Sequence, residues 1–471
     1  MGEKNIDGGT VTAMPRRNKI FFSLGEVGDN VAYQTFSFLV FTYYFAIVRL
    51  PVLWISAGFI IWAVWNAVND NLIGIVSDRT KTRFGRRRPW MIVAVVPLAM
   101  MMVLLFTVPP GDDVVHFVYF LCVLFIFDGV YSMFNVNYNA LFSEMFVSMK
   151  DRSDVGRLRS TFVVVALVLA LALPSIIIED MANEHGYPYT ADQYLTSGII
   201  AGIIVVVVYS LVIKLGVEER VEFSKDSESA PSFGDSVKFT FKNKSFRIFL
   251  VAAMAMWICN GILPSMFPLF AAYAIGISDP TVGGILLLLS FIVGAVTMPL
   301  WAHMRKKRGA RFVGIVALAW WGVSLLLLMM SWNVESGIVF MLIMGFGLGG
   351  SIYFYDQCIA EIIDEDEVTL GIRRSGSYYG VITFIIRLSM VLNFVIVGLL
   401  FTGAEWSVFT PNPGVEPVMA LRFLIGIYPA IVLTFGLVSL WKYPIHGARL
   451  QEIRGKLDEL HSKKRSDASR N

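Results

Sequence analysis

Long apolar runs, broken by short polar or charged segments, form the main pattern of this chain. About 20 consecutive apolar residues let one helix cross the roughly 30 Å hydrocarbon core of a bilayer. We therefore predict an all-helical (all-α) membrane protein with about twelve transmembrane helices and short connections. The predicted spans are residues 20–47, 51–77, 90–109, 114–143, 158–180, 194–216, 246–275, 280–303, 312–331, 334–363, 376–403 and 418–442.

The loops between these spans alternate in charge. Loops after the even-numbered spans are rich in Lys and Arg, whereas the opposite loops are short and carry acids such as Asp112, Asp113 and Asp192. Because basic loops stay on the cytoplasmic side, we expect a multi-pass protein of the cell membrane with both termini cytoplasmic. The basic residues are Arg79, Lys81, Arg83, Arg86 to Arg88, Lys150, Arg152, Arg220, Lys225, Arg305 to Arg308, Arg373 and Arg374.

The longest connection divides the predicted helices six and six. It is rich in Ser, Glu, Lys and Asp, and a basic hairpin recurs at corresponding places in the two halves, at residues 77–89 and 304–311. Such repeats are typical of transporters built from two related bundles, so we expect two pseudo-symmetric six-helix bundles. The expected units are an N-terminal bundle at 1–216, a cytoplasmic linker at 217–245, a C-terminal bundle at 246–442 and a cytoplasmic tail at 443–471.

The composition argues against a soluble enzyme. With 471 residues, 56 % of them hydrophobic, and a mean hydropathy of +0.65, the chain is more apolar than a soluble globule requires. It shows no nucleophile and base pair, no nucleotide-binding loop and no metal-ligand spacing of its three cysteines. A net charge of +3 indicates no nucleic-acid partner. Residues 1–19 lack the short apolar core of a secretory signal.

Polar side chains in the predicted membrane helices gather on a few faces. Asn66, Asn69 and Asp70 stand at i, i+3 and i+4 in the second span, so they share one face. Such groups are costly at bilayer depth and need a partner, a hydrated cavity or a function. The other polar residues are Asp29 and Asn30 in the first span, Tyr131, Ser132, Asn135 and Asn139 in the fourth, Arg159 at the start of the fifth, and Tyr379, Thr383 and Arg387 in the eleventh.

These polar faces have two interpretations. Single Asn or Tyr residues commonly join membrane helices through hydrogen bonds. A set that combines a carboxylate with guanidinium groups, spread over the first, second, fourth and eleventh helices, indicates a central hydrated cavity, which we favour. Asp128, Asp356 and Arg422 lie near helix ends or lack a polar face, and structural pairing is at least as good an interpretation for them.

Several motifs resemble one transporter family. The segments WNAVNDNLIG at 65–74, SDRT at 77–80 and RFGRRRPW at 83–90 are similar to the second helix and following loop of the glycoside-pentoside-hexuronide:cation symporters, the melibiose-permease-like branch of the major facilitator superfamily. This resemblance implies the major facilitator superfamily fold and cation-coupled sugar transport. The resemblance extends to residues 25–30, Arg159 with Phe162, residues 360–373 and Arg387.

The resemblance also implies roles for the polar residues. In that family a carboxylate at the position of Asp70 is central to the coupling cation, and we expect Asn66, Asn69 and Ser132 to assist it. The positions that face the sugar in the family include several of the polar residues named above. The expected substrate-binding residues are Asp29, Asn30, Tyr131, Asn135, Asn139, Arg159, Thr383 and Arg387.

The chain departs from the melibiose transporter at several of these positions. Asn30, Asn66 and Asn135 stand in place of acids, and Asn139 stands in place of a sugar-stacking tryptophan. Recognition of galactosides through paired carboxylates is therefore not expected. A site with one carboxylate suits a proton, because the neutral oxygens that would complete a sodium shell are weaker ligands for a hard cation. We favour H+ over Na+ as the coupling ion, with Na+ still open, and expect no cofactor.

Together these features predict a secondary active transporter. It would couple the movement of a small polar solute, such as a sugar, glycoside or uronide, to a cation by alternating access between two bundles. Two alternatives stay open: a lipid or amphiphile transporter of the same superfamily, and a membrane sensor that binds solute without moving it. The expected partners are the solute, the cation and the lipid bilayer, with the protein a monomer.

Overall fold

The structure is a computed structural model that describes residues 14–80, 82–146, 149–181, 190–218, 233–371 and 374–468. Within these ranges the chain is helical, apart from loops and one isolated bridge between Thr82 and Gly85. The predicted all-helical fold is therefore confirmed. Of the basic loop residues, Lys81, Arg220, Lys225 and Arg373 lie outside the described residues, as do residues 219–232 of the predicted linker.

Helices α1 to η3 form the first half of the molecule. The first crossing consists of three consecutive pieces, of which the last is a π-helical turn. The elements are α1 (Arg16–Ser23), α2 (Gly25–Thr42), η1 (Tyr43–Ile47), α3 (Val52–Arg79), α4 (Arg88–Leu104), α5 (Asp113–Met145), α6 (Met149–Leu167), η2 (Val168–Ala172), α7 (Leu173–Ile177), α8 (Thr190–Leu211) and η3 (Val212–Gly216).

Helices α9 to α15 form the second half, and α16 follows as a separate tail helix. Within α11 the backbone kinks at Gly309, whose φ of 83° favours glycine, so this element comprises two crossings. The kink lies in the second basic hairpin of the sequence. The elements are α9 (Phe233–Lys242), α10 (Lys244–Phe270), η6 (Ala271–Ile275), α11 (Pro280–Leu328), α12 (Val334–Leu370), α13 (Ser375–Gly403), α14 (Val415–Arg422), η7 (Phe423–Ile427), α15 (Tyr428–Trp441) and α16 (Gly447–Ala468).

Twelve crossings can be traced in the described part of the chain. Nine of its helices are long and apolar enough to span a membrane. The other three crossings are the first, which is broken into short pieces, α4, which has 17 residues, and the part of α11 beyond the kink. Each predicted span therefore corresponds to helical structure.

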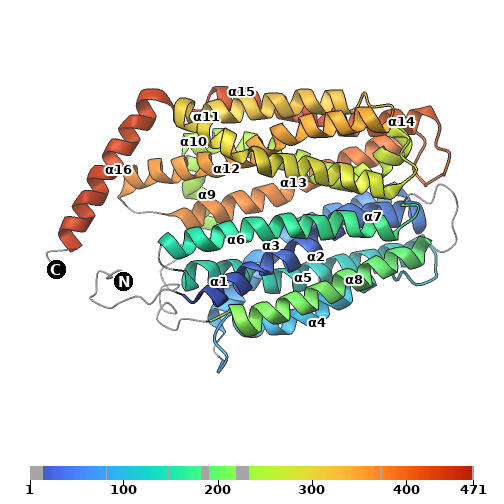
Figure 1. Ribbon diagram of the computed structural model, residues 1–471, viewed down its shortest axis with the longest axis horizontal. Coiled ribbons are helices and arrows are strands. Elements are labelled where there is room, and N and C mark those ends of the chain that lie inside the picture. The colour runs from blue at the N-terminus through green and yellow to red at the C-terminus, as the bar shows by residue number, and fades with distance from the viewer. Residues whose placement is uncertain are drawn as a thin grey trace.

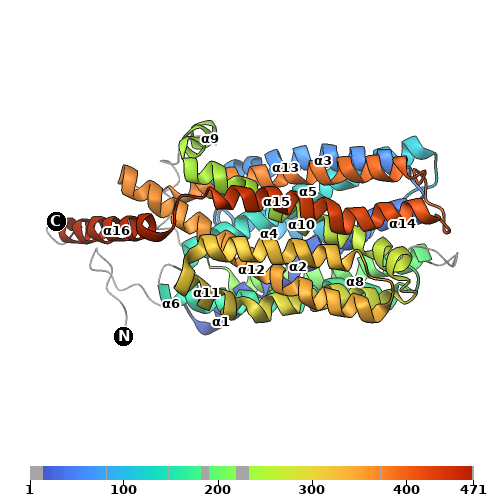
Figure 2. The same cartoon turned by 90° about the horizontal axis from the view of Figure 1, so that it is seen from above.

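The crossings run side by side along the long axis of the molecule (Figure 1). The first half, coloured blue to green, lies beside the second half, coloured yellow to red. The first and last described helices, α1 and α16, lie at the same end of the molecule, which we call the terminal end, and the opposite one is the distal end (Figures 1 and 2). Successive crossings alternate in direction, so the basic segments at 86–88 and 305–308 lie at the terminal end.

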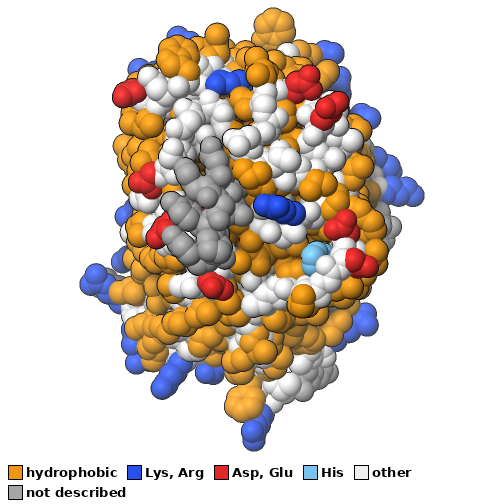
Figure 3. All heavy atoms as spheres, turned by 90° about the vertical axis from the view of Figure 1, so that its right-hand side faces the viewer, with side chains coloured by type: hydrophobic (Ala, Val, Ile, Leu, Met, Phe, Trp, Pro, Cys, Tyr) orange, Lys and Arg blue, Asp and Glu red, His pale blue; other side chains and the backbone are white. Residues whose placement is uncertain are grey.

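Aromatic side chains close the interface between the halves at the distal end. Phe45 of η1 lies 5.4 Å from Phe401 and 5.0 Å from Trp406, measured between ring centroids. Phe59 of α3 stacks on Phe394 of α13 at 4.0 Å. We call these five residues the distal seal. All five are buried, and the part of the distal face that the described residues form shows no wide opening (Figure 3).

The helix backbones also approach closely at the distal end. A Cβ at Gly284 of α11 would lie 2.0 Å from Ser175 Oγ of α7, so this glycine allows the two halves to touch. Beside it, Thr281 Oγ1 donates a hydrogen bond to the carbonyl of Ser175 at 3.1 Å. The distal closure therefore rests on packing and backbone contact rather than on charge.

The terminal end is built differently. Ion pairs between described residues at this end join helices of the same half. In the first half Arg87 contacts Asp78 at 2.8 Å, and in the second half Arg449 of α16 contacts Glu365 of α12 at 2.6 Å. No ion pair between described residues crosses from one half to the other here.

Candidate functional site

An ion pair joins the two halves midway along the spanning helices. Arg387 Nη2 of α13 donates to Asp70 Oδ2 of α3 at 3.1 Å. Among the described residues this is the one ion pair that connects the halves. The side chains remain 22 % exposed for Asp70 and 21 % for Arg387, so the pair is not sealed from its surroundings. The sequence grouped Arg387 with the solute, whereas the structure places it against the cation residue.

The polar face of α3 meets α5 around this pair. Ser132 Oγ donates to Asp70 Oδ1 at 2.5 Å. Next to it, Asn69 Nδ2 donates to Asp128 Oδ2 at 3.1 Å, and Asp128 is only 2 % exposed. The sequence left Asp128 as a candidate for structural pairing, and the structure brings it to the predicted cation residues.

Asn66 completes the same face one turn earlier on α3. Its side chain is 2 % exposed, and its Oδ1 atom has no hydrogen-bond partner among the described residues. A buried acceptor without a donor is costly, so this oxygen is a candidate ligand for a group that would satisfy it. We refer to these residues together as the α3 cluster: Asn66, Asn69, Asp70, Asp128, Ser132 and Arg387.

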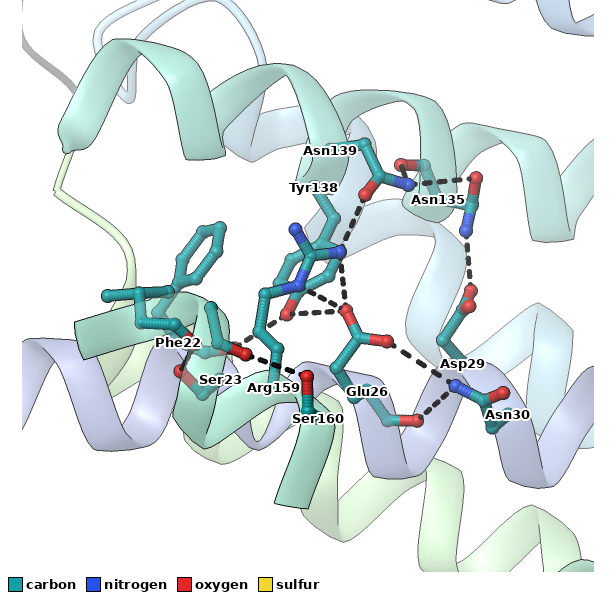
Figure 4. A network of polar contacts seen from close by, with 12 residues as sticks. Phe22, Ser23, Glu26, Asp29, Asn30, Asn135, Tyr138, Asn139, Arg159 and Ser160 are labelled. Atoms are coloured by element: carbon teal, nitrogen blue, oxygen red, sulfur yellow. Dashed lines mark hydrogen bonds and ion pairs between the residues drawn. The ribbon is translucent and has the colours of Figure 1, made fainter. Parts of the chain in front are cut away.

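A second cluster centres on an ion pair within the first half (Figure 4). Glu26 of α2 pairs with Arg159 of α6, and Arg159 Nη2 also donates to Asn139 Oδ1 at 2.8 Å. The guanidinium lies over the Tyr138 ring, 5.2 Å from its centroid, and Tyr138 Oη reaches Glu26 Oε1 at 3.4 Å. Asn30 Nδ2 donates to Glu26 Oε2 at 3.4 Å.

Asp29 and Asn135 extend this cluster towards the middle of α5 (Figure 4). Asn135 Nδ2 donates to Asp29 Oδ1 at 2.6 Å, and Asn139 Nδ2 donates to Asn135 Oδ1 at 3.2 Å. Tyr131 Oη lies 3.4 Å from the same Asn135 nitrogen. We refer to these residues together as the α2 cluster: Glu26, Asp29, Asn30, Tyr131, Asn135, Tyr138, Asn139 and Arg159.

The two clusters meet on α5. Tyr131 belongs to the α2 cluster and Ser132, the next residue, bonds to Asp70. The Tyr131 ring packs against Tyr33 of α2 at 5.8 Å and Phe127 at 6.0 Å, which gives this junction an aromatic wall. The structure therefore brings eleven of the twelve predicted site residues into one connected polar region.

Thr383 is the predicted site residue that joins neither cluster. It lies one turn before Arg387 on α13, its side chain is exposed, and it forms no hydrogen bond with described residues. Its i, i+4 spacing to Arg387 places it on the same helix face.

Sequence analysis missed Glu26 and Tyr138. Glu26 precedes Asp29 and Asn30 by three and four residues, so the same spacing argument that grouped the α3 residues could have found it. Glu26 was not included because it lies near the start of the predicted span 20–47. The two clusters hold four carboxylates and two guanidinium groups among their described residues, so the region is richer in acid than the sequence argument allowed.

The described residues contain no group of three or more His, Cys, Asp or Glu side chains arranged to hold a metal ion. All three cysteines are free, with Cys122 exposed and Cys259 and Cys358 buried. The polar region is instead a set of carboxylates, amides, hydroxyls and guanidinium groups, which can donate to and accept from polar groups of a ligand.

Comparison with known proteins places this arrangement in context. The model of the family described as MFS/sugar transport protein matches residues 21–447. The glucuronide carrier protein homolog of Escherichia coli (strain K12) is 22 % identical over 451 residues, covering 94 % of this chain and 95 % of that protein. Sodium-dependent lysophosphatidylcholine symporter 1 of Xenopus tropicalis is 22 % identical over 517 residues, covering 100 % and 96 %.

The fold also resembles solved structures. A bacterial homologue of the human lysosomal transporter Spinster, in an inward-facing and unoccupied conformation, superposes with a TM-score of 0.67. The alignment covers 92 % of this chain and 98 % of that one at 12 % sequence identity. At this identity the likeness concerns the fold alone.

Proposed function

Since this chain belongs to the MFS/sugar transport protein family and is a multi-pass membrane transporter rather than an enzyme, we propose that it moves a neutral sugar or glycoside together with a cation by alternating access. The observation that carries this proposal is the polar region of the first half, which the Asp70 and Arg387 pair joins to the second half. Buried ionisable groups at this depth call for a function.

We propose that the terminal end faces the cytoplasm. The segments at 86–88 and 305–308, rich in Arg and Lys, lie at that end, and basic segments stay cytoplasmic. Because the distal seal is closed, we infer that the described conformation is the one that faces the cytoplasm. Solute would be released on that side.

The α3 cluster is the proposed cation site. Asp70 and Asp128 supply two carboxylates, Ser132 a hydroxyl, and Asn66 an amide oxygen that has no hydrogen-bond partner among the described residues. The sequence favoured H+ because a single carboxylate was expected. Two carboxylates and an unpartnered neutral oxygen favour Na+, a hard cation that oxygen ligands bind. The similarity to a sodium-dependent symporter supports this choice.

The same cluster suggests how cation binding is coupled to movement. Arg387 is the positive partner of Asp70 in the described conformation. A cation at Asp70 would compete with the guanidinium for the same carboxylate, and releasing Arg387 would loosen the contact between α3 and α13. Cation binding would thereby favour separation of the halves at the distal end.

The α2 cluster is the proposed solute site. It offers carboxylate, amide, phenol and guanidinium groups, which can donate to and accept from sugar hydroxyls. Arg159 is already paired with Glu26, and Arg387 with Asp70. A uronide would bring a further negative charge to a region that holds four carboxylates and two guanidinium groups, so an uncharged solute fits better.

A lipid-like solute is the second candidate. Its support is the similarity over the whole chain to a lysophosphatidylcholine symporter. The α2 cluster favours a sugar instead, because a lipid tail would have to pass beside buried carboxylates and amides.

Uptake into proteoliposomes tests the proposal. Labelled neutral mono- and disaccharides, uronides and lysophosphatidylcholine are supplied under an imposed Na+ gradient or an imposed pH gradient. The expected result is accumulation of a neutral sugar driven by Na+ and abolished by Asp70→Asn. Asp113→Asn is the matched control, because Asp113 is an exposed carboxylate at the distal end of α5. Accumulation driven by pH alone would assign H+, and solute binding without uptake would indicate a sensor.

A further inference from the structure

A basic and aromatic surface lies on the cytoplasmic side of the second half. It is formed by α9 and the first turn of α10, and Figure 2 shows α9 standing out from the side of the bundle next to α13, near the terminal end. We call it the α9 surface. Its exposed residues are Lys238, Phe239, Phe241, Lys242, Lys244 and Arg247.

Contacts with the bundle hold α9 in place, and one of them involves Phe239 of the exposed surface. Thr240 is 1 % exposed, and the Arg374 guanidinium lies 5.0 Å from the centroid of the Phe239 ring. At the junction with α10, Asn243 Nδ2 donates to Tyr378 Oη of α13 at 3.2 Å. The surface is therefore fixed to the cytoplasmic end of α13, the helix that carries Arg387.

The charges of the α9 surface are not neutralised within the described part of the chain. Lys238, Lys242, Lys244 and Arg247 form no ion pair with any described residue. Four cations in this short stretch repel one another, and an external anion would relieve that repulsion. An anionic group on another molecule could supply that charge.

Two exposed phenyl rings accompany these cations. Phe239 is 39 % exposed and Phe241 is 38 % exposed. On α10, Val251 lies one turn beyond Arg247 and is 43 % exposed. The basic surface is thus followed on the same face of this membrane-spanning helix by an apolar side chain. Cations followed by rings and then by aliphatic groups match the change from phosphate headgroups to acyl chains.

We propose that the α9 surface binds the headgroups of anionic phospholipids in the cytoplasmic leaflet, with Phe239 and Phe241 inserted at the boundary of the acyl chains. The exposed apolar side chains beside the cations, Phe239, Phe241 and Val251, favour lipid over an acidic protein partner, which would not require them. Because α9 packs on α13, bound lipid would restrain the cytoplasmic end of that helix. The proposal does not depend on which solute is carried.

Lipid titration of the full-length protein in neutral detergent tests it. Retained lipid adducts are counted by native mass spectrometry with phosphatidylglycerol and with phosphatidylcholine. Each basic residue near an anionic membrane contributes about fivefold to binding, so Lys242→Gln with Lys244→Gln should weaken phosphatidylglycerol binding by roughly tenfold or more. The matched control replaces Lys306 and Lys307, which are exposed on α11 at the terminal end of the molecule. Equal losses in both variants, or no preference for phosphatidylglycerol, would overturn the proposal.

A second measurement reports the depth of the surface. A nitroxide is attached at Phe241→Cys in a background that carries Cys122→Ser, since Cys122 is the exposed cysteine. In liposomes with phosphatidylglycerol, the label is expected to be more accessible to oxygen than to a water-soluble nickel complex. The same label at Glu459→Cys, exposed on α16, should show the opposite order. A water-like result at position 241 would show that the rings do not enter the membrane.

Discussion

Asp70 of α3 and Arg387 of α13 lie 3.1 Å apart and form, among the described residues, the one ion pair between the two halves of the transporter. Most of each side chain is covered, so removing one partner leaves the other charged in a poorly solvated place. The pair therefore links stability to the arrangement of the halves.

We predict that Arg387→Gln lowers the free energy of unfolding by about 2 kcal/mol, because Asp70 then loses its partner. The double variant Asp70→Asn with Arg387→Gln should recover most of this loss, since no charge is left unpaired. Thermal unfolding in detergent measures both. Neither variant should accumulate solute, and equal instability of the single and double variants would show that the pair contributes little.

Asp128→Asn should raise the Na+ concentration needed for half-maximal uptake by roughly tenfold or more. The change removes one of the two carboxylates of the proposed cation site and keeps an acceptor for Asn69, which donates to Asp128 at 3.1 Å. Uptake measured as a function of Na+ at constant pH checks this, with Asp113→Asn as the control. An unchanged Na+ dependence would remove Asp128 from the cation site.

Glu26→Gln should change which solutes are accepted. Glu26 neutralises Arg159, and without its charge the guanidinium can pair with an anionic solute. We expect competition by a uronide against the transported neutral sugar to improve by about tenfold. Arg159→Gln, which removes the cation, should not gain uronide binding. Equal inhibition by the uronide in wild type and Glu26→Gln would show that this pair does not select solute charge.

Gly284→Leu should hold the distal end open and abolish transport. Its side chain would meet Ser175 Oγ and the carbonyl of Leu171, which a Cβ alone would approach to 2.0 and 2.8 Å. Gly403→Leu is the matched control, because nothing lies within 4 Å of a Cβ there. Labelling of a cysteine placed at Phe45 by a membrane-impermeant reagent from the outside should increase only with the Gly284 variant. Protection in both variants would show that α7 and α11 do not form part of the closure.

The hydropathy pattern predicts the crossings well because each needs its own apolar run, and the break at Gly309 coincides with a basic hairpin. The search for apolar spans did not predict α9, because its 10 residues are too few to cross a membrane, although their amphipathic pattern is present in the sequence. Nor could it predict the interruption near Leu24, which divides the first crossing into pieces.

The candidate site was predictable in part. Helical spacing grouped Asn66, Asn69 and Asp70, because residues on one face follow from the periodicity of the helix. Partners on other helices do not follow from spacing. The contact of Asp70 with Arg387 joins positions more than 300 residues apart, and the approach of Asn69 to Asp128 depends on how α3 packs on α5. These contacts changed the proposed ion from H+ to Na+ and narrowed the proposed solute to a neutral sugar or glycoside.

The distal seal is made of rings, and this has a consequence for temperature. Opening it exposes Phe45, Phe394, Phe401 and Trp406 to water, and the driving force that buries such surface weakens on cooling. Salt hardly affects contacts between uncharged rings. Cold should therefore shift the resting population towards outward access at any ionic strength.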